Sequence, residues 1–285
     1  MGEVWQAQHA TLDRPVALKL LRIHTSELRA QLLHEARVLA SLRHPAIVGV
    51  HDAGVTAEGV AYIAMDLLVG QSLSTQIYRQ RLDAHAAVAL FIELLGGLEA
   101  AHTAGVIHRD IKPDNVLLVA RPPGVAPILI DFGIAQGTAT GGQRSPTVAG
   151  TPEYMAPEQL RGMPCDERTD VWASCISLYE TITGRVPFTG ADLATTARSV
   201  ITSPLAYPTD VPGLDGKLWS ILTCGLRKDA ADRTASACEL RTSLASWLAR
   251  DTLPNLPMSN SDAPVRRLSQ PSPFETLIRK KLTKV

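Results

Sequence analysis

The hydrophobic periodicity of the chain changes near Val69-Gly70, and this change most limits the folds that the sequence can adopt. Before it, residues 16–21 and 59–68 follow strand patterns, while residues 26–42 place apolar side chains at helical spacing. After it, helical patterns dominate, at residues 73–79, 85–104, 169–183, 193–201, 214–226 and 235–248, with short strands near 116–119 and 128–130. The sequence therefore predicts an α+β fold, in which a small strand-rich part precedes a larger, mostly helical part.

The composition excludes several classes of protein. Lys and Arg together number 28, as do Asp and Glu, and the resulting net charge of zero argues against nucleic-acid binding. Glu93 interrupts the longest apolar stretch, residues 86–98, and no basic region precedes an apolar segment at the N-terminus, so we expect no integral membrane segment and no signal peptide. The four cysteines are far apart without C-x-x-C spacing, which favours reduced thiols and a cytoplasmic location over a zinc cage or disulfides.

Glu35 departs from the pattern of its helix, because it lies in the apolar stripe between Leu32 and Leu39. A carboxylate on a buried helix face is costly unless a cation pairs with it. Lys19, in the strand just before this helix, is one candidate partner. The pattern by itself also fits an ordinary structural ion pair or a helix whose buried face is shifted.

Two further segments concentrate polar residues beside apolar strands. His108-Arg-Asp-Ile-Lys-Pro-Asp-Asn115 holds two carboxylates, an Asn, a Lys and an Arg, and it cannot continue as a helix past Pro113. The apolar strand that follows it indicates that this turn is held against a core. Ile128-Leu-Ile-Asp-Phe-Gly133 is an apolar strand that ends on a carboxylate, and Gly133 permits an unusual backbone angle. Carboxylates at strand ends commonly bind metal ions, so Asp131 is a candidate metal ligand.

Together these segments resemble the signature set of the protein kinase family, in the order that the family has. The matching residues are Lys19 in Val16-Ala-Leu-Lys19, Glu35, His108-Arg109-Asp110 with Asn115, Asp131-Phe132-Gly133, and Ala156-Pro157-Glu158. The resemblance covers about residues 2–249. Within it, Lys112 and the segment from Gly150 to Glu158 are similar to the serine/threonine branch, and the compact body resembles the bacterial members of the eukaryotic-like family.

The resemblance implies a two-lobed protein-kinase fold. Residues 1–68 would form a small N-terminal lobe, truncated at its start, with an antiparallel sheet and one helix. Residues 69–249 would form a large, mostly helical C-terminal lobe. We expect residues 250–285 to be a flexible tail, because they are rich in Pro and Ser and because residues 251–285 carry six basic but only three acidic side chains.

The resemblance also implies roles for the polar residues in phosphoryl transfer from ATP. Lys19 would hold the α- and β-phosphates, and Glu35 would fix the Lys19 ammonium group. Asp131 and Asn115 would bind Mg²⁺, or Mn²⁺ in its place, since both offer the oxygen ligands that such ions prefer. Asp110 would accept the proton of the substrate hydroxyl.

Lys112 would neutralise charge on the transferred phosphate, and Thr151 would hydrogen-bond close to Asp110 and Lys112. The other residues that the resemblance implies surround the adenine. Val4, Ala17 and Leu117 would sandwich the ring, Met65 would be the gatekeeper, and the backbone of Asp66 and Leu68 would contact the ring edge.

Arg109, directly before Asp110, implies regulation, because in such kinases this Arg pairs with a phosphate on the activation segment. Ser145 and Thr147 are the candidate phosphate acceptors in that segment, and an unmodified loop is the alternative. This implies self-association, so that one copy phosphorylates another.

Four more residues match the family in structural roles. Glu158 and Arg233 resemble an ion pair that braces the large lobe. Asp170 resembles the buried acid that holds the catalytic loop. Cys175 stands where the family usually has a glycine, and its side chain is small enough to be accommodated.

The glycine-rich loop is where the resemblance fails. The family has G-x-G-x-x-G-x-V after a first strand, whereas here only Gly2 and Val4 match. One explanation is that the start codon is assigned too late. The other is that the chain is a catalytically impaired module that binds nucleotide or serves as a scaffold.

The sequence thus predicts a serine/threonine protein kinase that transfers the γ-phosphate of ATP to Ser or Thr hydroxyls of proteins and phosphorylates its own activation segment. The impaired nucleotide-binding or scaffold module is the alternative. A kinase of small molecules is disfavoured, since the segment from Gly150 to Glu158 forms a shelf for peptide substrates in the family that it resembles.

Overall fold

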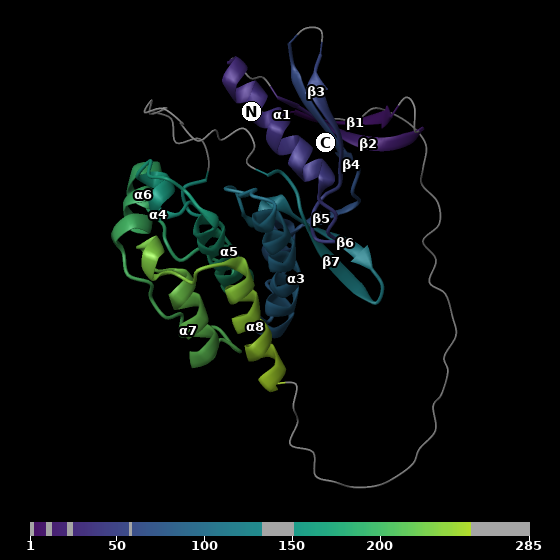
Figure 1. The fold of residues 1–285 in the computed structure, drawn as a ribbon. Coiled ribbons are helices and arrows are strands. Elements are labelled where there is room, and N and C mark those ends of the chain that lie inside the picture. Colours follow the sequence, from purple (N-terminus) through teal and green to yellow (C-terminus); the bar gives the residue numbers. More distant parts are fainter. Residues whose placement is uncertain (1–2, 10–12, 22–24, 57–58, 133–150, 252–285) are drawn as a thin grey trace, which may run out of the picture.

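The structure, a computed structural model, describes residues 3–9, 13–21, 25–56, 59–132 and 151–251. Its N-terminal part is a four-stranded antiparallel sheet in the order β1-β2-β4-β3, with one helix beside it (Figure 1). These elements are β1 (Glu3–His9), β2 (Arg14–Leu21), α1 (Ser26–Ser41), β3 (Val50–Val55) and β4 (Ala61–Asp66). This arrangement confirms the expected small antiparallel sheet with a single helix.

Strand β2 lies inside this sheet, between β1 and β4. Ala17 pairs with Met65 of β4, and both are buried. Helix α1 buries Leu32, Ala36 and Leu39, whose spacing of four and three residues puts them on one face. The helix therefore covers the sheet with the apolar stripe that the sequence predicts.

A second, three-stranded antiparallel sheet joins the two parts of the fold. It has the order β5 (Gly70–Ser72), β6 (Val116–Arg121), β7 (Gly124–Leu129). The segment before β3 is bonded to β7, since Val48 N–H donates to Leu129 O at 3.0 Å and Leu129 N–H donates to Ala46 O at 2.8 Å. A 3₁₀ turn, η1 (Pro113–Asn115), leads directly into β6, so the strand anchors the polar segment that precedes it.

The C-terminal part is mostly helical, as the sequence predicts. Its helices are α2 (Leu73–Arg79), α3 (Ala84–Thr103), α4 (Pro157–Leu160), α5 (Glu167–Thr183), α6 (Leu193–Thr202), α7 (Gly216–Gly225) and α8 (Ala237–Asp251), with a 3₁₀ turn η2 (Ala230–Asp232). Several begin at an Asp N-cap, such as Asp83 before α3 and Asp166 before α5. Helices α3 and α5 form the centre of the core, and α8 packs against both (Figure 1).

Helix α3 is the one described helix that is long and apolar enough to cross a membrane by length and composition. It lies in the core here, with Val88, Phe91, Leu94, Leu95 and Leu98 fully buried. It contacts α5, α8 and β7. Packing against these elements accounts for its apolar character, and its exposed side includes the charged Glu93.

Helices α5 and α7 approach closely at Cys175 and Gly225. Cys175 is completely buried in α5, and burial raises the pKa of its thiol to about 12. A Cβ atom at Gly225 of α7 would collide with Cys175 Sγ. The thiol expected to be accommodated at position 175 therefore has its space because position 225 carries no side chain.

Candidate active site

Asp170, in the first turn of α5, holds the polar segment by its backbone. Its carboxylate is fully buried and accepts the His108 and Arg109 N–H groups, each at 2.8 Å. Arg109 has a φ of 65°, a left-handed conformation that is uncommon outside glycine. Two charge-assisted bonds stabilise this turn. The implied role of Asp170 as the buried acid that holds this loop is confirmed.

The His108 ring connects the same segment to the end of β7. The ring Nε2 lies 3.0 Å from the Ile130 carbonyl and must donate to it, while Nδ1 accepts the Asp110 N–H at 3.3 Å. Burial lowers the pKa of His108, which favours the neutral ring that this bonding pattern requires. The ring also packs against Phe132, with centroids 4.4 Å apart and the two planes tilted by 43°. The ring thereby links the backbone of Asp110 to that of Ile130, the residue before Asp131.

Asp110, Lys112 and Asn115 form one hydrogen-bonded group. Lys112 Nζ lies 3.2 Å from Asp110 Oδ1 and 3.1 Å from Oδ2. Asn115 Nδ2 donates to the Asp110 backbone carbonyl at 2.7 Å and to Asp110 Oδ2 at 2.9 Å. A carboxylate has about four acceptor positions, so Asp110 can still accept a further proton donor. Because both amide hydrogens of Asn115 point this way, its Oδ1 remains available as a ligand.

Lys19 and Glu35 are not paired with each other, which differs from the contact expected from the sequence. Lys19 Nζ instead lies 2.9 Å from Asp131 Oδ1. The Glu35 carboxylate accepts from Gln31 Nε2 at 3.0 Å and lies 3.9 Å from Arg109 Nη1. The physical reason is that α1 places Glu35 toward Arg109, which offers a cation to a half-buried carboxylate while Lys19 neutralises Asp131.

Most residues expected around the adenine form one apolar cluster. Ala17 and Met65 are buried against Val48, with Val4 and Leu68 packed on them. Leu117 lies half-buried in β6, paired with Ile128 of β7, which belongs to the same cluster.

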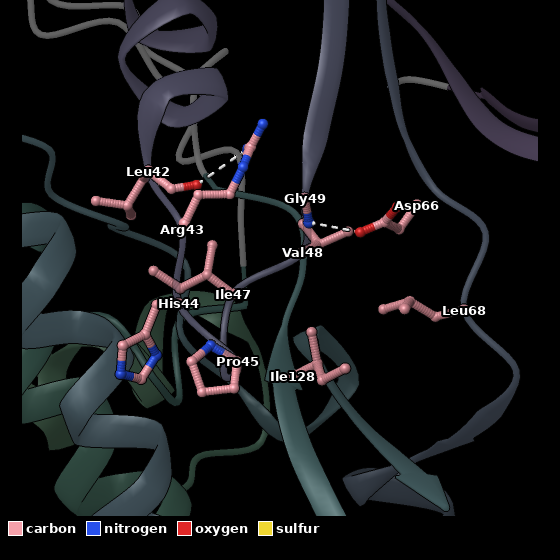
Figure 2. Close-up of a pocket in the computed structure, with 10 residues that line it drawn as sticks. All are labelled: Leu42, Arg43, His44, Pro45, Ile47, Val48, Gly49, Asp66, Leu68 and Ile128. Carbon is pink, nitrogen blue, oxygen red and sulfur yellow. Dashed lines mark hydrogen bonds between the residues drawn. The ribbon is translucent and has the colours of Figure 1, made fainter. Parts of the chain in front are cut away.

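The side chain of Asp66 points toward the start of β3, as Figure 2 shows. It accepts the Gly49 N–H at 3.2 Å and lies 2.6 Å from His51 Nε2. The Asp66 N–H itself donates to the Gly49 carbonyl at 2.9 Å. That N–H is therefore occupied, and only other atoms of the Asp66 backbone can meet a ligand.

A hollow of about 430 Å³ lies between residues 42–49 and the segment of Asp66 and Leu68 (Figure 2). Ile128 of β7 also lines this hollow, and the described residues that line it do not include Lys19, Asp110 or Asp131. This hollow is therefore separate from the polar group around Asp110, although it shares Asp66 and Leu68 with the expected adenine site.

Glu158 and Arg233 form the expected ion pair. Arg233 donates two bonds to the Glu158 carboxylate, at 2.8 and 2.9 Å, and Thr169 adds a third at 3.0 Å. Burial alone would raise the pKa of Glu158, but the hydrogen bonds and charge of Arg233 bring it below its usual value. Gln159, which the sequence analysis missed, donates from Nε2 to the Arg109 carbonyl at 3.0 Å. Its position three residues into α4, typical of a helix-capping Gln, is the signal that could have found it.

The remaining expected residues either lie apart from the group of Asp110, Lys112 and Asn115 or fall outside the residues that the structure describes. Thr151 accepts the Tyr154 N–H with its backbone carbonyl, and among the described residues its side chain has no hydrogen bond to Asp110 or Lys112. Ser145 and Thr147 lie outside the described residues, as do Gly2 and Gly133.

A small antiparallel sheet joined to a helical part, with an Asp–Lys–Asn group between them, defines a protein of the kinase fold. The family model described as "Protein kinase domain" matches residues 1–241. The chain therefore belongs to the protein kinase family. Membership implies the use of ATP and a divalent metal ion.

Three relatives are bacterial proteins. The serine/threonine-protein kinase PkaB of Streptomyces coelicolor is 38% identical over 90% of this chain and 61% of its own length. The serine/threonine-protein kinase pkn3 of Myxococcus xanthus is 35% identical over 96% of this chain and 53% of its own length. A probable serine/threonine-protein kinase PknB of Bifidobacterium longum is 34% identical over 87% of this chain and 38% of its own length. The chain thus spans less than two thirds of each of these relatives.

Proposed function

We propose that this chain is a serine/threonine protein kinase, which transfers the γ-phosphate of ATP to hydroxyl groups of proteins. The observation that carries the proposal is the group formed by Asp110, Lys112 and Asn115 on a loop that Asp170 fixes. A carboxylate, an ammonium and an amide at hydrogen-bond distance supply what phosphoryl transfer needs, which is positioning and charge neutralisation. The names of the bacterial relatives support Ser and Thr as acceptors.

The donor atoms fit a magnesium ion. The Asn115 Nδ2 group donates to Asp110, so the Asn115 Oδ1 atom can face a metal ion. Asp131 offers a second carboxylate oxygen besides the one that contacts Lys19. Hard divalent ions prefer such oxygen ligands and keep several waters. Mg²⁺ is the ion that we propose, held by Asn115 and Asp131, and Mn²⁺ would suit the same atoms. When bound, the ion would neutralise charge on the phosphates of ATP.

The residues of the chain would then divide the work as follows. Asp110 accepts the proton of the acceptor hydroxyl as its oxygen bonds to phosphorus and the bond to the ADP oxygen breaks. Lys112, beside Asp110, offsets the negative charge that spreads over the transferred group. Lys19 leaves Asp131 to bind phosphate oxygens. The apolar cluster of Ala17 and Met65 receives the adenine and excludes water from one wall.

The contact between Glu35 and Arg109 supports regulation by phosphorylation. A phosphate on Ser145 or Thr147 would compete for the Arg109 guanidinium and release Glu35 toward Lys19. We propose that one copy of the chain phosphorylates another at these residues. A cytoplasmic location accords with the four cysteines, all of which are free.

The test is the intact mass of the purified chain after incubation with Mg-ATP, beside the Asp110→Asn variant. We expect added phosphate only in the unmutated chain, and on a generic protein substrate as well. Asp114→Asn is the matched control, because Asp114 lies in the same loop but is exposed and bonded to Ser74. Absence of incorporation in a chain that circular dichroism shows to be folded would contradict the proposal and favour the nucleotide-binding or scaffold alternative. Transfer to small molecules alone would favour the other alternative.

A further inference from the structure

A second hollow, of about 250 Å³, lies where α3, α5 and α8 meet, and these three helices contact one another (Figure 1). Among the residues that line it are His102 in the last turn of α3, Glu167 in the first turn of α5, and Cys238 in the first turn of α8. Each helix thus contributes one side chain of a type that binds transition-metal ions. The residues around Asp110 are not part of its lining.

His102 has a ring nitrogen without a hydrogen-bond partner at this hollow. Its Nε2 lies 2.8 Å from Asp170 Oδ2, and Asp170 also accepts two backbone N–H groups. An acceptor of three donors is an ionised carboxylate, so Nε2 must carry the proton. The His102 side chain is only 5% exposed, and its Nδ1 has no hydrogen bond. A buried polar atom in this state is costly unless something outside the chain satisfies it.

The distance between His102 and Glu167 suits a shared ion. His102 Nδ1 and Glu167 Oε2 are 3.8 Å apart, which is too long for a hydrogen bond. Zinc ligands lie about 2.0–2.2 Å from the ion, so two donors at this separation can bind the same one. A histidine that donates its other N–H to a carboxylate, as His102 does to Asp170, is the arrangement found behind most metal-bound imidazoles.

A third ligand requires a movement of Cys238. In the part of the chain that the structure describes, no group of three or more His, Cys, Asp or Glu side chains could hold a metal ion as the side chains stand. Cys238 is an exposed free thiol that lines the hollow, so rotation of its side chain is not hindered by burial. Glu99 also lines the hollow, but its carboxylate is paired with Arg241 at 2.7 Å.

We propose that this hollow binds one zinc ion, with His102 Nδ1, a Glu167 oxygen and the Cys238 sulfur as ligands and water in the fourth position. Binding converts the Cys238 thiol to a thiolate and releases its proton to solvent. The ion fixes the ring of His102, whose other nitrogen contacts Asp170. Since Asp170 holds the backbone of His108 and Arg109, the ion stabilises the catalytic loop from a site outside it.

Cobalt(II) is the spectroscopic probe for the test, because its bond to a thiolate gives an absorption band that oxygen and nitrogen ligands do not. The full chain is treated with a chelator, freed of it, and titrated with Co²⁺. We expect one equivalent of ion to produce the band and Zn²⁺ to displace it. Cys238→Ser should abolish the band, and Glu167→Gln should weaken binding roughly tenfold or more. Cys224→Ser, which changes another exposed cysteine on α7, is the matched control and should leave the titration unchanged.

Three results would overturn the proposal. They are the absence of a band in the unmutated chain, a band that persists in Cys238→Ser, and a band that Cys224→Ser removes equally. Circular dichroism of each variant in chelator verifies that the fold is retained. The titration requires no ATP and no turnover, so its outcome is independent of the proposed kinase activity.

Discussion

Lys19 and Asp131 are joined by an ion pair of 2.9 Å, although one lies in the N-terminal sheet and the other follows the last strand of the second sheet. The pair neutralises the carboxylate that we propose as a metal ligand. In the proposed reaction Lys19 exchanges this carboxylate for phosphate oxygens of ATP, which leaves both oxygens of Asp131 to the metal ion. The contact thus occupies the Lys19 ammonium in the structure, and the proposed binding of ATP would release it.

Replacement of Asp131 by Asn should remove phosphoryl transfer while the fold is retained. The variant loses the charge that would bind the ion, and the loss of a single preorganised electrostatic contact costs about 100-fold or more in rate. Phosphate incorporation measured across a Mg²⁺ titration would check this. Asp210→Asn is the control, since Asp210 sits in an exposed ion pair with Arg185. If the variant keeps more than about a tenth of the rate, the proposed role of Asp131 as a metal ligand is wrong.

Replacement of Arg109 by Gln should raise the ATP affinity of the unphosphorylated chain. Arg109 lies 3.9 Å from Glu35, and its loss frees the carboxylate to pair with Lys19. The gain should be small, roughly two- to fivefold, because a single ion pair of this kind contributes about 0.2–1 kcal/mol. Calorimetric titration of phosphatase-treated protein with ATP measures the change. Arg37→Gln is the control, because Arg37 is exposed on α1, the helix that carries Glu35. Equal ATP affinities in the two variants would contradict the competition of Arg109 and Lys19 for Glu35.

The ion pair of Glu158 and Arg233 should make stability dependent on pH. The pKa of Glu158 in the folded chain is below its usual value of 4.5, so the unfolded chain binds a proton more readily. The stabilisation is complete above that value and is lost as the pH falls through the lower pKa of the folded chain. Near neutral pH, Glu158→Gln should cost about 3–5 kcal/mol, since it leaves the buried Arg233 without its partner. Denaturant unfolding of both chains between pH 7 and acid, at about pH 3, should show the difference shrinking, whereas a constant difference would show that the charge is not the cause.

Cys175 and Gly225 should behave as a coupled pair. Gly225→Ala should destabilise the chain by about 1–3 kcal/mol, because the added Cβ collides with Cys175 Sγ. In a chain that already carries Cys175→Ala the same change should cost much less, with a coupling of roughly 0.5–3 kcal/mol. Urea unfolding of the four chains of this cycle measures it. Strictly additive effects would mean that the space at Gly225 is not limited by the thiol.

Periodicity predicts most of this fold, because buried faces must repeat with the period of their own element. The helix expected at 73–79 has the same bounds as α2, and the helix expected at 169–183 begins two residues after α5 does. Strand β3 was missed, since its sequence of alternating small and polar residues carries little apolar signal and is placed by pairing with β4. Edge strand β1 also carries little apolar signal, and β2 is the one strand that pairs with it in the described sheet.

The site divides along a similar line. The loop around Asp110 is recognisable from the sequence, because its polar residues are contiguous and flanked by a strand. The partner of Glu35 is not, since the sequence offers both Lys19 and Arg109 as cations, and only the structure shows that Lys19 lies against Asp131 and Arg109 near Glu35. The hollow lined by Cys238 cannot be predicted from the sequence either, because its lining residues come from three segments that lie far apart along the chain.

The attachment of the loop around Asp110 to Asp170 also has a consequence for the order in which the chain is synthesised. His108 precedes the acid that holds it by 62 residues. At a synthesis rate of about 5–20 residues per second, roughly 3–12 s pass between the appearance of the one and of the other. Late in that interval the nascent chain already carries Asp110, Lys112, Asn115 and the strand that follows them, but not the carboxylate that holds the backbone of His108 and Arg109. A chain that ended before residue 170 would thus carry Asp110, Lys112 and Asn115 without the buried carboxylate that fixes the backbone at the start of their loop.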